Sequence, residues 1–253
     1  MSRAIKLFSP DYEIALGDIR LTQGVTFEVH QGARSWAKVR FTPRYKAALP
    51  AIALRSPATI RLGYGDDAAG SAAVFSGMVM TAYSDGAAAN EIGLLDASAE
   101  LATTKITANF RQATPAEIVR HCVSQAGIQE MALPSPPAAA RQSFVAAGEP
   151  VTAVLDRINT LWNLNVFWRI IDGKFWWGGR PVQDKVYKFE YAVSIISLGR
   201  YQGQWRLETV SVPFIHAGDL IDVDHPDFTG RPEVKKIVFK SDENGFIRSY
   251  LYF

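Results

Sequence analysis

The hydrophobic residues of this 253-residue chain change their period twice, from two residues to the helical period and back to two. In the N-terminal part, apolar and polar residues alternate in short runs separated by turn residues: 25–29, 37–41, 59–62, 74–80 and 91–95. Such alternation marks strands that bury one face. Several short strands at this spacing predict a β-barrel or a sandwich.

A helical block follows, and it begins at a capping box. Thr114 takes the N-cap position, Pro115 is the first helical residue, and Glu117 stands one turn into the helix. Apolar residues then recur at helical spacing as far as Gly127, which suits a C-terminal cap. We predict a helix over residues 115–126 and a second amphipathic helix that starts near Pro150.

An aromatic hairpin ends the helical block. Residues 165–170 and 174–177 are rich in aromatic and β-branched side chains, and the Asp172–Gly173 pair between them is typical of a hairpin turn. From residue 181 onward the strand pattern returns, in the runs 186–189, 204–212, 220–224, 234–240 and 246–253.

The predicted fold class is therefore β-rich α+β. Its order is a β part over residues 1–105, an α+β module of two helices and the aromatic hairpin over 106–180, and a second β part over 181–253. No residue-level repeat relates the two β parts.

Charge and composition exclude several classes of protein. The 27 Lys and Arg residues nearly balance the 25 Asp and Glu residues, and a net charge of +2 argues against electrostatically driven nucleic-acid binding. The single cysteine, Cys122, excludes an internal disulfide and a multi-cysteine zinc site, and we expect it to be a buried small hydrophobe. We find no signal-peptide pattern and no apolar run long enough to span a bilayer, so we expect a soluble chain.

The densest set of possible metal ligands is His216, Asp219, Asp222, Asp224, His225 and Asp227. On a strand, Asp222 and Asp224 share one face while His225 points to the other, so the set does not converge without a bend. We interpret His216–Asp219 as a turn that starts a strand, with the aspartate bonding locally. The sequence thus predicts no catalytic, cofactor-binding or metal-binding residues. A two-histidine and carboxylate metal site is the alternative.

The α+β module contains four of the chain's six tryptophans: Trp162, Trp168, Trp176 and Trp177. They fit an aromatic core under the second helix, or a surface that anchors a partner, because aromatic residues concentrate at the centres of interfaces. Trp176 and Trp177 are adjacent on one strand and cannot both face its core. We predict a partner interface at Trp176, Trp177 and the exposed edge near Tyr250 and Tyr252.

Several stretches match one family in order and spacing: Val74–Phe75–Ser76–Gly77, the run from Phe110 to Val119, Gln125–Ala126–Gly127–Ile128, Gly148–Glu149–Pro150–Val151, and the run from Pro213 to Ile221. With these motifs the chain resembles the late control protein D family of phage tail baseplate hubs. That family is related to the hub part of type VI secretion spike proteins. The resemblance covers nearly the whole chain, and its specificity comes from the order of motifs that are loose one by one.

The resemblance implies a homotrimer in which each chain contributes two tube-like β-barrel domains to a pseudo-hexameric ring. Such a ring is a symmetry adaptor: it joins the sixfold tail tube, or a distal tail protein, to a threefold central spike. It would line the DNA passage during genome ejection, touching DNA only in passage, while the α+β module holds baseplate wedge or other tail proteins.

The same resemblance implies a structural virion protein of the tail baseplate, assembled in the host cytoplasm. It implies no enzyme activity, no cofactor and no membrane span. Because this chain stops at its last strand, whereas the secretion spike proteins continue into a needle, we expect the spike to be a separate polypeptide.

Two other functions stay open. One is a metal-dependent hydrolase that uses His216, Asp219 and Asp224, which stoichiometric metal in the purified protein would favour. The other is a monomeric β-barrel that binds a small ligand in an apolar interior. A persistent monomer in solution would favour that reading.

Overall fold

The computed structural model describes residues 10–32, 34–43, 45, 51–64, 71–82, 90–134, 138–164, 166–171, 173–178, 183 and 185–253. The chain divides into two compact units. Unit 1 combines Met1–Leu95 with Val182–Phe253, and unit 2 is Asp96–Pro181. The predicted β-rich α+β class is confirmed, because strands dominate and the helices of the described residues all belong to unit 2.

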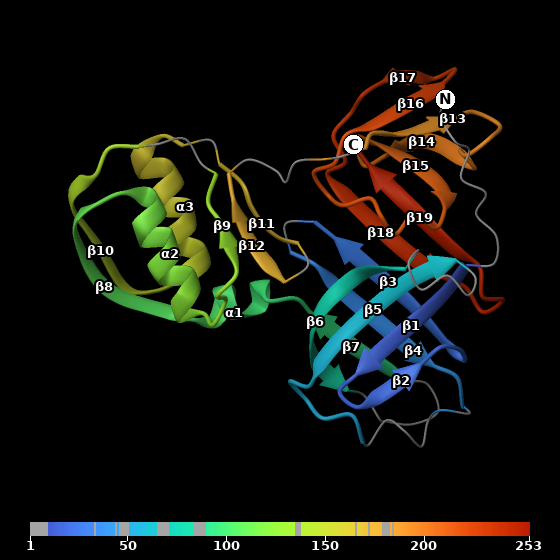
Figure 1. Cartoon of the computed structure of the whole chain (residues 1–253), viewed down its shortest axis with the longest axis horizontal. Coiled ribbons are helices and arrows are strands. Elements are labelled where there is room, and N and C mark those ends of the chain that lie inside the picture. The colour runs from blue at the N-terminus through green and yellow to red at the C-terminus, as the bar shows by residue number, and fades with distance from the viewer. Residues whose placement is uncertain are drawn as a thin grey trace. The chain divides into compact units, whose positions relative to one another are not determined.

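Unit 1 is built from strands at both ends of the chain. The earlier group is β1 (Pro10–Leu16), β2 (Ile19–Leu21), β3 (Val25–Gln31), β4 (Trp36–Phe41), β5 (Pro57–Tyr64), β6 (Ala72–Ala82) and β7 (Glu91–Leu95). The later group is β13 (Tyr187–Glu190), β14 (Ser197–Tyr201), β15 (Gln204–Val210), β16 (Ile221–His225), β17 (Phe228–Gly230), β18 (Lys236–Ser241) and β19 (Ile247–Tyr252). Figure 1 colours the earlier group blue to green and the later group orange to red.

Eleven of these strands form a single sheet, in the order β14-β15-β19-β18-β3-β4-β7-β6-β5-β1-β2. The other three form a small sheet in the order β13-β16-β17, with β13 parallel to β16. The alternation in the sequence explains the buried face of the large sheet: Val25, Phe27 and Val29 of β3 are buried, while the residues between them are half-buried.

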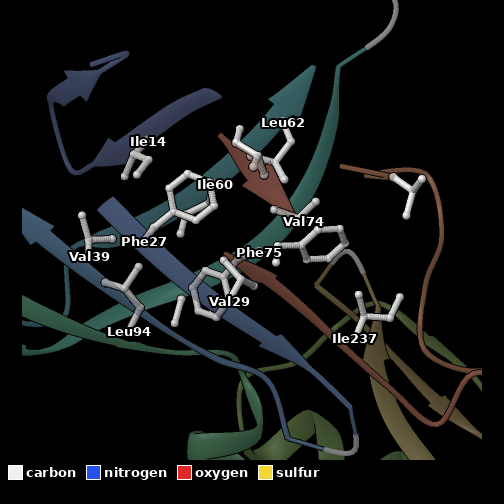
Figure 2. Close-up of a cluster of buried hydrophobic side chains, with 14 of the residues drawn as sticks. Ile14, Phe27, Val29, Val39, Ile60, Leu62, Val74, Phe75, Leu94 and Ile237 are labelled. Carbon is white, nitrogen blue, oxygen red and sulfur yellow. The ribbon is translucent and has the colours of Figure 1, made fainter. Parts of the chain in front are cut away.

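The pairing of β3 with β18 joins the two groups of strands. The two strands are antiparallel, with Phe239 opposite Val29. The buried Ser241 hydroxyl accepts a hydrogen bond from the backbone N–H of Phe27 at 2.8 Å. One hydrophobic cluster contains side chains of both groups, and Figure 2 draws Ile237 of β18 within it. Most strands of the β parts predicted at residues 1–105 and 181–253 therefore lie in one sheet, and the two parts share one core.

Unit 2 is continuous in sequence. Its elements are α1 (Ser98–Thr103), β8 (Lys105–Ala113), α2 (Pro115–Gln125), β9 (Met131–Ala132), β10 (Arg141–Pro150), α3 (Val151–Trp162), β11 (Trp168–Ile171) and β12 (Lys174–Trp177). β8 and β10 form a two-stranded antiparallel ribbon, and β11, β12 and β9 form a three-stranded sheet. Within the described ranges, no helix is both long enough and apolar enough to cross a membrane.

Both predicted helices are confirmed, and the capping box is complete. The Thr114 hydroxyl accepts a hydrogen bond from the backbone N–H of Glu117, whose carboxylate accepts one from the backbone N–H of Thr114 at 2.8 Å. The hydrogen bonds that the backbone N–H and the hydroxyl of Thr114 donate to the Glu117 carboxylate hold its pKa below the usual value. The apolar faces of α2 and α3 meet in a second core cluster, together with Phe144 of β10 and Phe175 of β12.

The structure differs from the sequence prediction at the borders of unit 2. Unit 2 begins at Asp96, because the fully buried Leu101 of α1 belongs to its core cluster. The predicted start at residue 106 falls inside β8, and neither β8 nor β10 was expected. The aromatic hairpin is confirmed by the pairing of β11 with β12 and by a φ of 76° at Gly173, while Asp172 lies outside the described residues.

Candidate interaction surface

The parity argument for the aromatic hairpin is correct, and the structure tells the two tryptophans apart. Phe175 and Trp177 lie on the side of β12 that faces the core of unit 2, and Trp177 is only 2% exposed. Trp176 lies on the other side and is half-buried. The Lys174 ammonium lies 5.1 Å from the centroid of the Trp176 ring. Trp177 is therefore a core residue of unit 2, contrary to the prediction that it forms part of the interface.

We predicted an exposed edge at Tyr250 and Tyr252, but the two tyrosines do not lie on an edge strand. They belong to β19, which is hydrogen-bonded to β15 on one side and to β18 on the other. Ile247 and Leu251 of the same strand are buried, so the alternation directs both tyrosines to the opposite face of the sheet. Both tyrosines are half-buried there, so the predicted exposed edge is corrected to a partly exposed face of the sheet.

The two tyrosines belong to a larger aromatic and basic surface on β14, β15, β19 and β18, which we call the tyrosine face. It consists of Tyr201, Arg206, Lys236, Tyr250 and Tyr252. The Arg206 guanidinium lies 5.4 Å from the ring centroid of Tyr201 and 5.6 Å from that of Tyr250. The Lys236 ammonium lies 5.3 Å from the ring of Tyr252. Such contacts hold cations over aromatic faces and fix their positions.

Burial raises the pKa of Tyr250 and of Tyr252 above the usual tyrosine value, so both phenols stay neutral at physiological pH. The neutral phenols and the adjacent cations give the tyrosine face hydrogen-bond donors and acceptors next to the apolar surfaces of the aromatic rings. Tyrosine and arginine are the residue types enriched at the energetic centres of protein interfaces. The arrangement is thus suited to binding a partner and contains no nucleophile poised for chemistry.

The carboxylates of Asp219, Asp222 and Asp224 each interact with a group of the protein itself. Asp219 accepts a hydrogen bond from the backbone N–H of His216 at 2.9 Å, as the predicted turn requires, and Gly218 has a φ of 101°. Asp222 lies 3.6 Å from Arg231, and Asp224 lies 3.4 Å from Lys188. Within the described residues, no group of three or more His, Cys, Asp or Glu side chains is placed to hold a metal ion.

His225 lies on the other side of β16 from Asp222 and Asp224, as predicted from strand alternation. Its Nδ1 accepts a hydrogen bond from the backbone N–H of Asp227, and its ring stands edge-on to Tyr191. An open surface pocket of about 560 Å³ lies here, lined by Glu190, Tyr191, Val193, Asp224, His225, Pro226 and Thr229. Carboxylates, an imidazole and apolar side chains line this pocket, and these described residues do not form an arrangement typical of a catalytic site.

Two further residues of potentially reactive type, Cys122 and His30, are held in structural roles. Cys122 is fully buried on the apolar face of α2, and burial raises the pKa of its thiol to about 12, so the thiolate required of a nucleophile does not form near neutral pH. His30 stacks on Trp36 with ring centroids 3.7 Å apart and contacts the Glu28 carboxylate at 2.5 Å. Burial lowers the pKa of His30.

Sequence reasoning missed Tyr201, Arg206 and Lys236 of the tyrosine face. The signal that could have found Arg206 is the alternation in β15, where Leu207 and Thr209 are buried and Arg206 and Glu208 are not. Joining Arg206 to Tyr252 requires the register of β15 with β19, and joining Lys236 to Tyr252 requires the register of β18 with β19. Alternation within one strand does not provide these registers.

Comparison with known proteins identifies solved structures that have a similar fold. No family model and no curated protein matches the sequence. The 43 kDa tail protein of prophage MuSo2 from Shewanella oneidensis has a similar structure, with a TM-score of 0.74 and 12% identity over 97% of this chain and 98% of that chain. A tail protein from Neisseria meningitidis has a TM-score of 0.72 and 10% identity, and the alignment covers 97% of this chain and 96% of that chain.

A third similar structure comes from a secretion system. The E. coli c3393 protein, a type VI secretion component with structural similarity to the T4 bacteriophage tail proteins gp27 and gp5, gives a TM-score of 0.67 at 14% identity. The alignment covers 90% of this chain and 72% of that chain. The predicted resemblance to tail hubs is thus confirmed at the level of the fold.

Proposed function

We propose that this chain is a structural hub protein of a phage or phage-like tail. Three copies form a ring that joins the tail tube to a central spike. The observation that carries the proposal is the joint between β3 and β18, by which two β parts of one chain pair edge to edge into one sheet. The likeness of nearly the whole chain to solved tail proteins supports it.

The joint explains how such a chain can serve as a symmetry adaptor. A chain with two β parts side by side presents six parts to the tail tube when three copies close around an axis, but only three identical chains to the spike. The sixfold and threefold partners are then matched by one polypeptide. The proposal gives the chain a structural role and no catalytic step.

The balance of charge fits a conduit for DNA. Each phosphate neutralised by a bound cation adds to the affinity that passage must overcome. A net charge of +2 over 253 residues keeps this attraction low. We therefore assign DNA a role only in passage.

The partly exposed aromatic residues supply contact surfaces for neighbouring tail proteins. In unit 2, Trp176 and the adjacent Lys174 are the accessible counterpart of the buried Trp177. In unit 1, the tyrosine face offers a second surface. We assign to these surfaces the tube or distal tail protein, a spike protein and the baseplate wedge. The site of action is the tail baseplate of the virion, after assembly in the host cytoplasm.

The test is the native mass of the purified chain by light scattering, together with negative-stain images. The proposal predicts a particle of about 84 kDa, three times the 27.9 kDa of one chain, with a central hole. A monomer that binds stoichiometric metal would instead favour a hydrolase, and a monomer that binds a small ligand would favour a ligand-binding barrel. Either result would contradict the hub.

A further inference from the structure

The strand β14 ends the large sheet of unit 1, and among the described residues it has a neighbouring strand on one side only. It pairs with β15 in a two-residue hairpin, in which Tyr201 lies opposite Gln204. Gln202 and Gly203, between them, have φ values of 49° and 80°. Positive φ at both central residues is the mark of the type I′ turn, whose twist matches that of the two strands.

The register of this hairpin fixes which backbone groups of β14 remain free. In a two-residue hairpin the residues that flank the turn exchange both hydrogen bonds, and bonded pairs then recur at every second residue. Ser197, Gly199 and Tyr201 therefore bond to β15. Leu198 and Arg200 direct their N–H and C=O groups away from it. Outside the strand pairings, no backbone hydrogen bond of the described residues uses the amide of Leu198 or Arg200.

The edge of β14 lacks the usual devices that stop edge strands from pairing with other chains. Such devices are proline, lysine, a β-bulge or a short, strongly twisted strand. β14 contains no proline or lysine, and its register with β15 is unbroken over five residue pairs. Its one charged side chain, Arg200, lies over the ring of Trp205 at 4.3 Å.

Exposed apolar side chains flank this edge. Tyr201 is 46% exposed, and Ile196 and Val193, just before the strand, are 49% and 79% exposed. The segment that carries them is fixed in place, because the Ile196 N–H donates to the Glu208 carbonyl at 2.8 Å and the Thr209 hydroxyl donates to the Ser194 carbonyl at 2.7 Å. A fixed strand edge with apolar flanks is a template for another strand.

The chain itself shows which kind of strand suits such a template. Its two β parts are joined by the antiparallel edge pairing of β3 with β18, over the four residue pairs from Ile237–Gln31 to Lys240–Glu28. We infer that β14 makes the corresponding joint with a second copy of this chain. This inference rests on the proposed trimer and names the surface by which its copies meet.

Symmetry limits the form of the contact. A ring of three copies with two β parts each has six junctions, and the β3 and β18 pairing supplies three of them within the chains. The other three lie between copies and are heterologous: β14 of one copy meets a different edge of the next. Pairing of β14 with another β14 would be isologous and would give a dimer.

The test compares Arg200→Pro with Arg200→Ala in the full chain. Proline removes the outward N–H and blocks an incoming strand, and an edge strand tolerates it on the side that faces away from its neighbour. Alanine removes the same contact with Trp205 but keeps the N–H. Light scattering over a dilution series should show that Arg200→Pro raises the concentration of half-dissociation by about tenfold or more, whereas Arg200→Ala remains close to the parent chain.

A second variant and a second measurement guard against misfolding of the proline variant. Gly199→Lys adds a protective charge to the edge, and no described atom lies within 4 Å of the new Cβ. Hydrogen exchange of the unmodified chain should show slow exchange at Leu198 and Arg200 in the trimer and fast exchange after dilution to monomers.

The outcomes separate this inference from the proposed function. A trimer in which the amides of Leu198 and Arg200 exchange fast, or which survives Arg200→Pro and Gly199→Lys, would overturn the role of β14 and leave the hub standing. A parent chain that stays monomeric at all concentrations would overturn both. A β14-dependent dimer would overturn the heterologous contact.

Discussion

The two units of this chain are stabilised in different ways. Unit 2 is one continuous segment whose core is made by helices and strands close together in sequence. Unit 1 is assembled from both ends of the chain, and the hydrogen bond from the Phe27 N–H to Ser241 spans 214 residues. Local contacts form with a small loss of chain entropy, whereas such long-range contacts require closure of a long loop. Unit 2 can therefore be built from local contacts, whereas unit 1 depends on the joint between β3 and β18.

Phe239→Ala should cause the largest difference in stability change between the two units. The phenyl ring is 0% exposed and lies on β18 opposite Val29, so its removal leaves a cavity at the joint. We expect the free energy of unfolding of unit 1 to fall by about 3–5 kcal/mol, with unit 2 unchanged. Urea unfolding followed by hydrogen exchange in each unit measures this.

Leu155→Ala in α3 is the matched control for that variant. Leu155 is buried in the core of unit 2, and its truncation should destabilise unit 2 by about 2–5 kcal/mol and leave unit 1 unchanged. If each variant shifted both units equally, the two units would unfold as one and the contrast would be wrong.

Ser241→Ala should have a medium effect on the joint. The substitution leaves the buried N–H of Phe27 without its acceptor, which costs about 1–3 kcal/mol in the stability of unit 1. Ser197→Ala, which removes an exposed hydroxyl hydrogen-bonded to Glu208, is the control and should change stability much less. Chemical denaturation of both variants provides the comparison, and equal losses would remove the special role of Ser241.

Thr114→Ala should weaken unit 2 alone, and by less. The Thr114 hydroxyl caps α2 by accepting from the backbone N–H of Glu117, and its loss is expected to cost about 1 kcal/mol. Thr114→Ser keeps the cap and should restore most of the stability. Thermal unfolding monitored at the helical signal would show whether the serine variant differs from the alanine variant.

The smallest effect is a pH dependence at the joint. His30 lies on β3 opposite Val238 of β18, and burial lowers its pKa in the folded chain. A histidine with a lowered pKa stabilises the fold fully above its unfolded pKa of about 6.5, and this contribution is lost as the pH falls through the lowered folded pKa. His30→Gln should therefore flatten the loss of stability of unit 1 between neutral and mildly acidic pH. An unchanged slope would show that other groups cause it.

The same contrast explains what the sequence could predict. The helices of unit 2 were predictable because the capping residues Thr114 and Glu117 and the apolar spacing are local signals. β8 and β10 were not predicted because the positions that face the core include small residues, Ala108 and Ala146, beside Phe110 and Phe144. Small residues make a weak alternation that resembles a connection.

The candidate surface was predictable only in part. Parity separated Trp176 from Trp177 and placed Trp177 on the same side as Phe175, but it could not say which side of the strand faces the core. Tyr250 and Tyr252 were expected at an edge, and the pairing of β19 with β15 covers that edge. The joint of β3 with β18 left no local signal, because the pairing of edges far apart in sequence depends on the whole sheet.

Electron cryomicroscopy of the purified assembly would show the ring and its strand pairing together. We expect a ring of three copies with a central hole and strong sixfold character. Strands should be continuous both at the β3 and β18 joint within each chain and at β14 between chains. A particle with another number of copies, or one in which the two β parts of a chain are not paired with each other, would contradict it.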